Sequence, residues 1–397
     1  MKIHQLEIEG YRSLKSQSWS PGDLNVLIGP NASGKSNVLR ALELLNFAAK
    51  GELGRYVLEE GGMDSIVWDG RVREIRLSAE TRSERVPLHS NYRYEICLMR
   101  IGKSSAYRIE NENLFQALWN EETRALENFY EKLIERDPRR AVAFSTDSKR
   151  IEFDGSSIAE GESFLSVLAV PFHANQDIAT FQKEMAGWKV YQSLRTDREA
   201  PIRLPQVARA DTRVNEDGRN LISVLHTRYT NDRDFENEID TAMRAAFGDD
   251  YEKLIFPPAA DQRIQMRIRL RSLKREIAAA DLSDGTLRFL FLLAVLADPS
   301  PPSLIAIDEP ETGLHPSMLP IVAEYARQAA IKSQVILTTH SPDFLDAFGS
   351  NPPTTTIVES NEGESVLRVV AGDELSYWLK KYSLGELYRS KELEAMK

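Results

Sequence analysis

The chain has 397 residues, 42% of them hydrophobic and 28% charged, and its formal net charge is −10. This length and composition indicate a soluble globular protein with one large domain or two ordinary ones. A single cysteine, Cys97, excludes a disulfide framework and a cysteine-based zinc site. The net negative charge excludes a global attraction to nucleic acid, so such binding would need a local basic surface.

Two apolar patterns bear on cellular location. The first residues, MKIHQLEIEG, place Ile3, Leu6 and Ile8 among polar residues, which predicts a strand rather than a signal peptide. The longest apolar run, FLFLLAVLA at 289–297, is too short to span a bilayer and predicts a buried helix. We therefore expect a cytoplasmic protein with no membrane partner.

Residues 29–36 match the pattern G-x-x-x-x-G-K-[ST] of a phosphate-binding loop. An apolar strand sequence, LNVLIG, precedes the loop, and SNVLRALELLNFAA follows with helical spacing. In such a loop, backbone N–H groups and the helix N-terminus attract phosphates, Lys35 reaches the β- and γ-phosphates, and the Ser36 hydroxyl contacts Mg²⁺. We expect the nucleotide to be bound by Gly29, Pro30, Asn31, Ala32, Ser33, Gly34, Lys35, Ser36 and Asn37.

The middle of the chain predicts strands and helices in alternation. Residues 73–82 and 91–101 have the period of strands. Residues 112–137 predict one long amphipathic helix, and residues 232–251 a second. Sustained heptads are missing, so long coiled-coil arms are not expected. These elements predict a lid or arch inserted into a nucleotide-binding core.

A basic segment, QRIQMRIRLRSLKRE at 262–276, predicts a strand with apolar residues on one face. Its arginines, which fall on the other face, would neutralise several phosphates of DNA or RNA. The alternative is an outer face paired with the many acidic residues of this chain. The arginines of that face are Arg263, Arg267, Arg269 and Arg271.

Three downstream segments complete a nucleotide-hydrolysing pattern. The apolar strand LIAI ends in Asp308 and Glu309, where one carboxylate suits the Mg²⁺ shell and the next suits an attacking water. Upstream, Ser283 and Gly285 begin an apolar helix, a second terminus that attracts anions. Downstream, the strand QVILTT ends before His340, which is placed to hydrogen-bond a γ-phosphate oxygen.

Taken in order, these segments resemble an ABC-type ATPase head of the SMC/RecF-like branch, and most of all bacterial predicted ATPases of the AAA_21 type. The resemblance implies that LSDGT (282–286) stands where transporters have the LSGGQ signature. It implies that Asp308 serves the metal, that Glu309 is the general base and that His340 is the switch histidine. His315 stands in the D-loop, where many ABC proteins have aspartate, and leaves the role of that loop in cross-subunit signalling open.

The resemblance also suggests two less specific assignments. GYRSLKS (10–16) is similar to the segment after the first strand of SMC-like heads, where Arg12 would approach the nucleotide. For the glutamine that contacts the metal, the candidate is Gln176, with Gln182 as its rival.

The fold expected from this resemblance is α/β, a P-loop NTPase of the ABC/SMC-like head type with a β-rich and helical insertion. The expected divisions are an N-terminal ATPase lobe (1–80), the insertion (81–280) and a C-terminal ATPase lobe (281–397). The expected function is ATP hydrolysis with Mg²⁺ in a head-to-head homodimer, in DNA maintenance or anti-phage defence. The alternative is a slow nucleotide switch that restrains or activates a separate effector protein, and turnover distinguishes the two.

Overall fold

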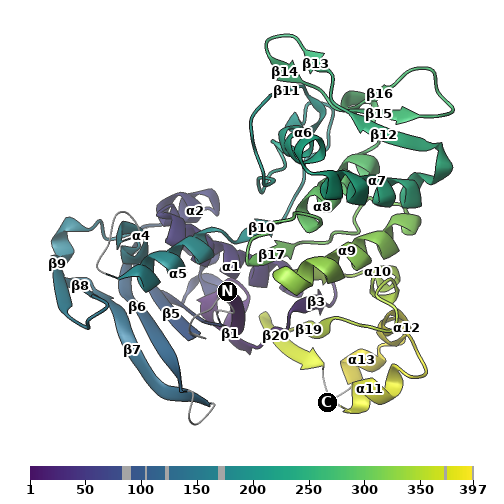
Figure 1. Cartoon of the computed structure of the whole chain (residues 1–397). Coiled ribbons are helices and arrows are strands. Elements are labelled where there is room, and N and C mark those ends of the chain that lie inside the picture. Colours follow the sequence, from purple (N-terminus) through teal and green to yellow (C-terminus); the bar gives the residue numbers. More distant parts are fainter. Residues whose placement is uncertain (83–90, 103–104, 121–124, 169–174, 371–372, 396–397) are drawn as a thin grey trace. The chain divides into compact units, whose positions relative to one another are not determined.

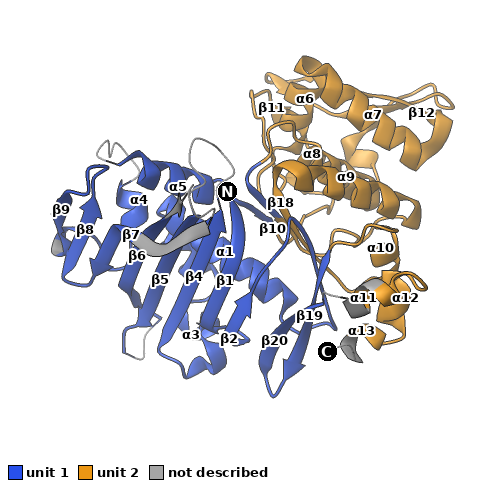
Figure 2. Ribbon diagram, turned by 60° about the horizontal axis from the view of Figure 1, so that its bottom comes forward, with its two compact units in different colours: residues 1–190, 302–305, 354–370 blue, residues 191–301, 306–353, 371–397 orange. Residues whose placement is uncertain are grey.

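The structure is a computed structural model of the chain (Figure 1), and it describes residues 1–82, 91–102, 105–120, 125–168, 175–370 and 373–395. Contacts divide the chain into two compact units, which Figure 2 colours separately. Unit 1 contains residues 1–190, 302–305 and 354–370, and unit 2 contains residues 191–301, 306–353 and 371–397. Each unit therefore joins segments that are distant in the sequence. The expected divisions at residues 80 and 280 stay predictions.

An antiparallel sheet of eight strands forms most of unit 1, in the order β2-β1-β4-β5-β6-β7-β8-β9. The inward side chains of β5 are buried, and the rings of Tyr92 and Tyr94 pack on Phe181 of α5 (Gln176–Ala186). The strands are β1 (Lys2–Tyr11), β2 (Leu14–Trp19), β4 (Glu74–Arg82), β5 (Asn91–Arg100), β6 (Tyr107–Asn120), β7 (Ala125–Asp137), β8 (Arg140–Phe144) and β9 (Arg150–Asp154).

The N-terminal strand is confirmed as β1. Its pairing with β4 shifts between Ile3 and Gln5, so Ile3 lies on the same buried side as Leu6 and Ile8 although its sequence parity differs. The strands expected at 73–82 and 91–101 are confirmed as β4 and β5.

The helix expected over residues 112–137 is wrong, because this segment forms the strands β6 and β7; residues 121–124 lie outside the described part. Positions 112, 114 and 116 of β6 face inward with the period of a strand. Two of these positions hold the polar residues Glu112 and Gln116, so no apolar alternation marks the strand. Pairing of β6 with β5 and β7 outweighs the local helical pattern.

A second group of strands in unit 1 carries the phosphate loop. Strand β3 (Leu24–Ile28) pairs in parallel with β19 (Thr354–Asn361), and β19 pairs antiparallel with β20 (Glu364–Val370). A distant part of the chain thus returns to the strand before the loop. The remaining elements of this unit are α1 (Lys35–Lys50), α2 (Leu53–Glu59), α3 (Met63–Ile66), α4 (Phe164–Leu168) and β10 (Lys189–Tyr191), whose last residue belongs to unit 2.

Unit 2 is built around the apolar helix α8 (Asp284–Leu296), which contacts α6 (Leu221–Asn231), α7 (Arg233–Phe247) and α9 (Leu319–Lys332). The expected buried helix at 289–297 and the helix expected within 232–251 are therefore confirmed. The division between the units falls within β17 (Leu304–Ile307). The other elements are β18 (Gln334–Thr339), α10 (Pro342–Asp346), α11 (Asp373–Trp378), α12 (Leu384–Arg389) and α13 (Glu392–Ala395).

The basic segment is not one strand, so the expected face of four arginines is wrong. Arg263 belongs to β14 (Arg263–Ile264), in a sheet with β11 (Gln206–Val207) and β13 (Pro258–Ala259). Arg267 and Arg269 belong to β15 (Arg267–Leu270), in another sheet with β12 (Tyr251–Ile255) and β16 (Ile277–Ala278), and both pair with Glu276. Arg271 follows β15. The alternative, pairing with acidic residues, therefore holds for the two arginines of β15.

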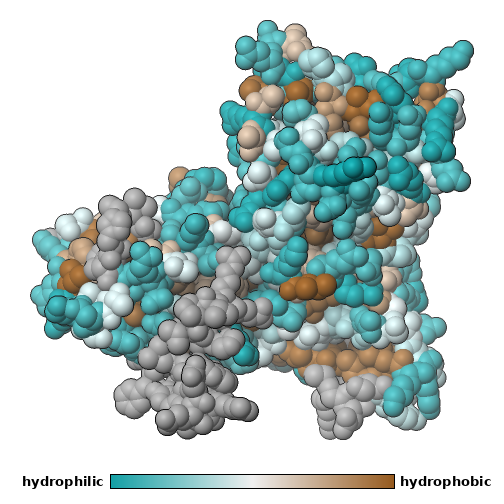
Figure 3. Space-filling model, viewed as in Figure 1, coloured by the Kyte–Doolittle hydropathy of each residue, from teal (hydrophilic) through white to brown (hydrophobic). Residues whose placement is uncertain are grey.

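No helix within the described residues is both long and apolar enough to cross a lipid bilayer. The face of the molecule in Figure 3 is predominantly hydrophilic.

Candidate functional site

The phosphate loop connects β3 to α1 in unit 1. Gly29 and Gly34 have φ angles of 149° and 104°, in the region that favours glycine. A Cβ atom at Gly29 would overlap the carbonyl oxygen of Val358 in β19, and one at Gly34 would overlap Ser365 Oγ in β20. Both the backbone conformation and the strands behind the loop therefore require glycine.

Two polar groups of the loop fit a bound phosphate. The Lys35 side chain is buried, and its Nζ donates hydrogen bonds to the carbonyl oxygens of Gly29 (2.8 Å) and Pro30 (3.0 Å). The buried Ser33 hydroxyl has no hydrogen-bond partner among the residues that the structure describes. An unsatisfied buried hydroxyl is costly, and phosphate oxygens accept from both lysine and hydroxyl groups. The residues of this loop therefore fit the phosphates of a nucleotide.

Two serines that the sequence did not reveal support the loop from behind. Ser365 of β20 is buried, and its hydroxyl donates to the carbonyl oxygen of Ser33 (2.6 Å) and bonds the Ser13 hydroxyl (2.6 Å). The Asn37 side-chain amide donates to the same Ser13 oxygen at 2.7 Å. These bonds tie the start of α1 to β20 and to the turn between β1 and β2.

Arg12 has partners of its own in unit 1. It adopts a left-handed backbone conformation with φ of 52°, and its guanidinium pairs with the carboxylate of Glu60. Arg40 pairs with that carboxylate at 2.9 Å. A nucleotide contact by Arg12 stays a prediction.

Replacing Gly34 by alanine is expected to lower ATP affinity about tenfold or more, because an L-residue in a left-handed conformation costs about 1–2 kcal/mol. The added methyl group would also displace Ser365. Titration calorimetry with ATP measures the effect. Gly54→Ala in α2 is the control, since its nearest neighbour, Tyr107 Oη, would lie 3.7 Å from the new Cβ. Equal affinity of wild type and Gly34→Ala would contradict the role of this glycine.

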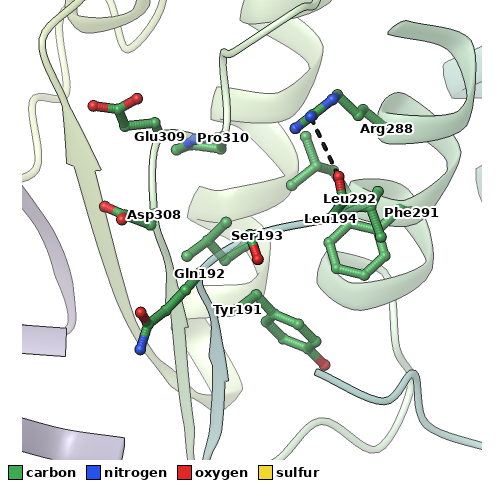
Figure 4. Close-up of a pocket in the computed structure, with 11 residues that line it drawn as sticks. Tyr191, Gln192, Ser193, Leu194, Arg288, Phe291, Leu292, Asp308, Glu309 and Pro310 are labelled. Atoms are coloured by element: carbon green, nitrogen blue, oxygen red, sulfur yellow. Dashed lines mark hydrogen bonds between the residues drawn. The ribbon is translucent and has the colours of Figure 1, made fainter. Parts of the chain in front are cut away.

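In unit 2, two adjacent carboxylates follow β17. The Thr338 hydroxyl donates to Asp308 Oδ1 and accepts from the backbone N–H of Glu309 at 3.0 Å. Glu309 has a φ of 45°, a strained conformation for a non-glycine residue of the kind found at functional sites. Figure 4 shows both carboxylates directed to the same side of the strand.

The Glu309 carboxylate is held from two directions. His340 Nδ1 lies 3.1 Å from Glu309 Oε1, and the Thr312 hydroxyl donates to Oε2 at 3.4 Å. Both Glu309 and His340 remain partly exposed, so a ligand and a water molecule have access to them. A carboxylate with this support is suited to accept a proton from water.

Gln192, which the sequence analysis did not propose, lies with these carboxylates. It follows Tyr191, whose carbonyl oxygen accepts the backbone N–H of Asp308 at 2.8 Å. Gln192, Asp308 and Glu309 line one pocket, and Figure 4 shows the Gln192 amide on the side of the carboxylates. The amide and carboxylate oxygens are ligands that suit Mg²⁺. The signal in the sequence that could have indicated Gln192 was its position directly after a strand.

The two glutamines proposed from the sequence lie in unit 1. Gln176 is exposed at the start of α5, and the Gln182 side chain donates to the Ala49 carbonyl oxygen at 2.6 Å. A metal contact by Gln176 stays a prediction, and Gln192 is the stronger candidate because it shares a pocket with Asp308.

The signature segment and the D-loop meet in unit 2. Ser283 caps α8, since its hydroxyl accepts the backbone N–H of Thr286 at 3.1 Å. A Cβ atom on Gly285 would lie 2.6 Å from the carbonyl oxygen of Gly313. These residues and His315 line one open pocket of about 720 Å³. His315 Nδ1 accepts the backbone N–H of Ser317 at 3.3 Å, which leaves its Nε2 as the protonated nitrogen of the neutral ring.

Residues 24–346 match the model of a family described as "AAA domain, putative AbiEii toxin, Type IV TA system". The DNA replication and repair protein RecF of Moorella thermoacetica is 26% identical to the chain over 121 residues, which are 30% of this chain and 31% of that protein. The chain thus spans about a third of the length of this curated relative.

Two solved structures share the fold. A crystal structure described as the SmcHead bound to the C-winged helix domain of ScpA has a TM-score of 0.58 and 14% identity, and the match covers 94% of this chain and 100% of that chain. An Smc head domain with an extended coiled coil, bound to the C-terminal domain of ScpA derived from Pyrococcus furiosus, has a TM-score of 0.50 and 14% identity, with coverage of 96% and 99%. At these identities the likeness shows the fold alone, which is that of an ABC/SMC-like P-loop ATPase head.

The family model extends from β3 into α10. This span includes the phosphate loop, the signature segment, the two carboxylates and His340, and the fold of the whole chain agrees with it. The chain therefore belongs to this AAA-domain family of P-loop ATPases.

Proposed function

We propose that this chain hydrolyses ATP in the presence of Mg²⁺ and that ATP joins two copies of it head to head. The observation that carries the proposal is the arrangement at Glu309, next to Asp308: its backbone has a strained positive φ, and its carboxylate is oriented by His340 and Thr312. A family of P-loop ATPases supplies the chemical class. The site residues proposed from the sequence keep their proposed roles, except that Gln192 replaces Gln176 as the glutamine proposed to contact the metal.

The roles of the residues follow from their chemistry. Lys35 and the backbone N–H groups of the loop bind the phosphates, as the buried lysine and the unsatisfied Ser33 hydroxyl suggest. Ser36, Asp308 and Gln192 would hold Mg²⁺, which when bound supplies positive charge that stabilises the phosphoryl group during transfer. Glu309 orients a water molecule and accepts its proton, and His340 orients the Glu309 carboxylate.

Association of two copies follows from the signature segment. Ser283 and Gly285 lie at the N-terminus of α8, where they line an open pocket of unit 2. The positive end of a helix attracts anions. We propose that this segment receives the γ-phosphate of the ATP bound by another copy, so that ATP binding joins the copies and hydrolysis separates them.

The biological setting we propose is DNA maintenance or anti-phage defence. Its basis is the name of the curated relative, a DNA replication and repair protein, and the toxin–antitoxin description of the family. The alternative, a nucleotide switch that controls an effector protein, draws on the two Smc heads that were solved with a domain of ScpA bound. A turnover well below one per minute that rises on addition of a partner protein would favour the alternative.

Light scattering of the Glu309→Gln protein tests the association. With saturating Mg-ATP we expect a mass twice that of the monomer, because the variant retains ATP without hydrolysing it. With ADP, or with Lys35→Ala added, we expect the monomer. A monomeric Glu309→Gln protein at saturating Mg-ATP would refute the proposed association.

A further inference from the structure

A buried cation lies behind the signature segment. The side chain of Arg203, at the end of the turn Pro201–Arg203, is only 7% exposed, and its contacts converge on one stretch of chain. Its donors bond the carbonyl oxygens of Thr196 (2.7 Å), Ala279 (3.3 Å), Ala280 (3.2 Å) and Leu282 (2.6 Å) and the carboxylate of Asp284.

The position of these acceptors gives Arg203 influence over the signature segment. Three of the carbonyl groups belong to residues 279–282, immediately before Ser283. The fork of N–H groups in a guanidinium holds several acceptors in a fixed arrangement, which a single ammonium does not reproduce. Arg203 therefore holds the backbone that leads into the N-terminus of α8.

The Asp284 contact adds an electrostatic effect. Asp284 stands between Ser283 and Gly285 and is 65% exposed in the first turn of α8. A carboxylate there is favourable for the helix dipole, but it repels an incoming phosphate. Pairing with Arg203 neutralises that negative charge without occupying the pocket in front of the helix.

We propose that Arg203 is a positioning residue for the binding of a triphosphate carried by a second copy of this chain. It fixes the backbone before Ser283 and cancels the charge of Asp284, so that the helix terminus stays attractive to an anion. This inference rests on the proposed function, because the triphosphate arrives with the second copy. The proposal predicts that the affinity of the phosphate loop of the same copy for ATP does not depend on Arg203.

The test is a double-mutant cycle in the Glu309→Gln background. Sedimentation velocity gives the ATP concentration at half-association, and calorimetry gives the ATP affinity of the monomer. We expect Arg203→Gln to raise the half-association concentration about tenfold or more, because it leaves Asp284 unpaired against phosphate. Adding Asp284→Asn is expected to bring that value back to within about threefold of the parent. Raising the salt concentration should reduce the Arg203→Gln defect by screening the exposed carboxylate.

Asp284→Asn alone provides a second measurement that does not depend on the folding of the Arg203 variant. Our proposal predicts a half-association concentration about threefold lower than that of the parent, because Arg203 then adds net positive charge. A merely structural pair predicts a higher concentration. Arg195→Gln, which removes an exposed partner of Asp197, is the matched control and should change nothing.

Three results distinguish the inferences. Failure of the Glu309→Gln parent to associate would reject the proposed function and this inference together. Association of the parent, with Arg203→Gln and the double variant equally defective, would reject only the inference and leave Arg203 a structural residue. A loss of ATP affinity in the monomeric Arg203→Gln protein would also reject the inference about Arg203.

Discussion

Glu309→Gln is expected to lower the steady-state rate of ATP hydrolysis by about 10²–10⁴-fold, the usual contribution of a general base. The carboxylate lies between His340 Nδ1 and the Thr312 hydroxyl, so the glutamine amide would fit the space but accept no proton. ATP affinity should remain close to that of wild type, since the phosphate loop is unchanged. Release of phosphate, followed with a coupled assay, measures the rate.

The control is Glu324→Gln on the exposed face of α9, where the carboxylate pairs with neighbouring side chains of its own helix. Its turnover should equal that of wild type. Turnover of the Glu309→Gln protein within tenfold of wild type would assign the general base to another group. Measuring both proteins with and without double-stranded DNA also shows whether nucleic acid stimulates hydrolysis.

Glu112→Ala is expected to have the largest effect on stability, about 3–5 kcal/mol, because it leaves a buried cation without its counter-ion. The Glu112 carboxylate is fully buried and lies 3.7 Å from Nη1 of buried Arg136. It also accepts hydrogen bonds from the Tyr94 hydroxyl (2.9 Å), the Ser163 hydroxyl (2.7 Å) and the backbone N–H groups of Phe164 (2.7 Å) and Leu165 (3.0 Å).

Urea unfolding, followed by tryptophan fluorescence, measures this loss. Burial and then the Glu112 charge raise the pKa of Tyr94 well above its usual value, so Tyr94 remains a hydrogen-bond donor throughout the pH range of the experiment. Glu110→Gln, on the same strand but paired at the surface with Arg108, is the control and should change the free energy of unfolding by at most about 0.5 kcal/mol. Equal stability of the Glu112→Ala and Glu110→Gln proteins would show that the network contributes little.

The polar network at Glu112 also explains why part of the fold was not predictable. A strand is recognised by apolar residues at every second position, but β6 places Glu112 and Gln116 at inward positions. Their burial is acceptable only because distant groups, Arg136 and residues 163–165, supply hydrogen bonds. A local reading of residues 112–137 therefore favoured a helix. For the basic segment at 262–276, the alternation of apolar and basic residues predicted one strand. That alternation continues past the point where β14 ends and the chain enters another sheet.

The candidate site shows the same distinction. Three parts of the site belong to short segments whose residue spacing indicates their chemistry. They are the phosphate loop, the carboxylates at 308 and 309, and the histidine at 340. Gln192 and Ser365 carry no such spacing. Gln192 lies near Asp308 because the carbonyl oxygen of the preceding Tyr191 accepts the Asp308 N–H. Ser365 supports the phosphate loop because β20 places it behind the loop.

By itself, the sequence determined the fold class, the phosphate loop, the strand-end carboxylates and the buried helix α8, because these depend on contiguous residues and local backbone geometry. Tertiary structure alone decided which glutamine accompanies Asp308, which serine supports the loop and which cation lies behind the signature segment. Those choices depend on hydrogen bonds between residues far apart in the chain. Such bonds have no fixed spacing in the sequence, and they form only when packing removes the competing water.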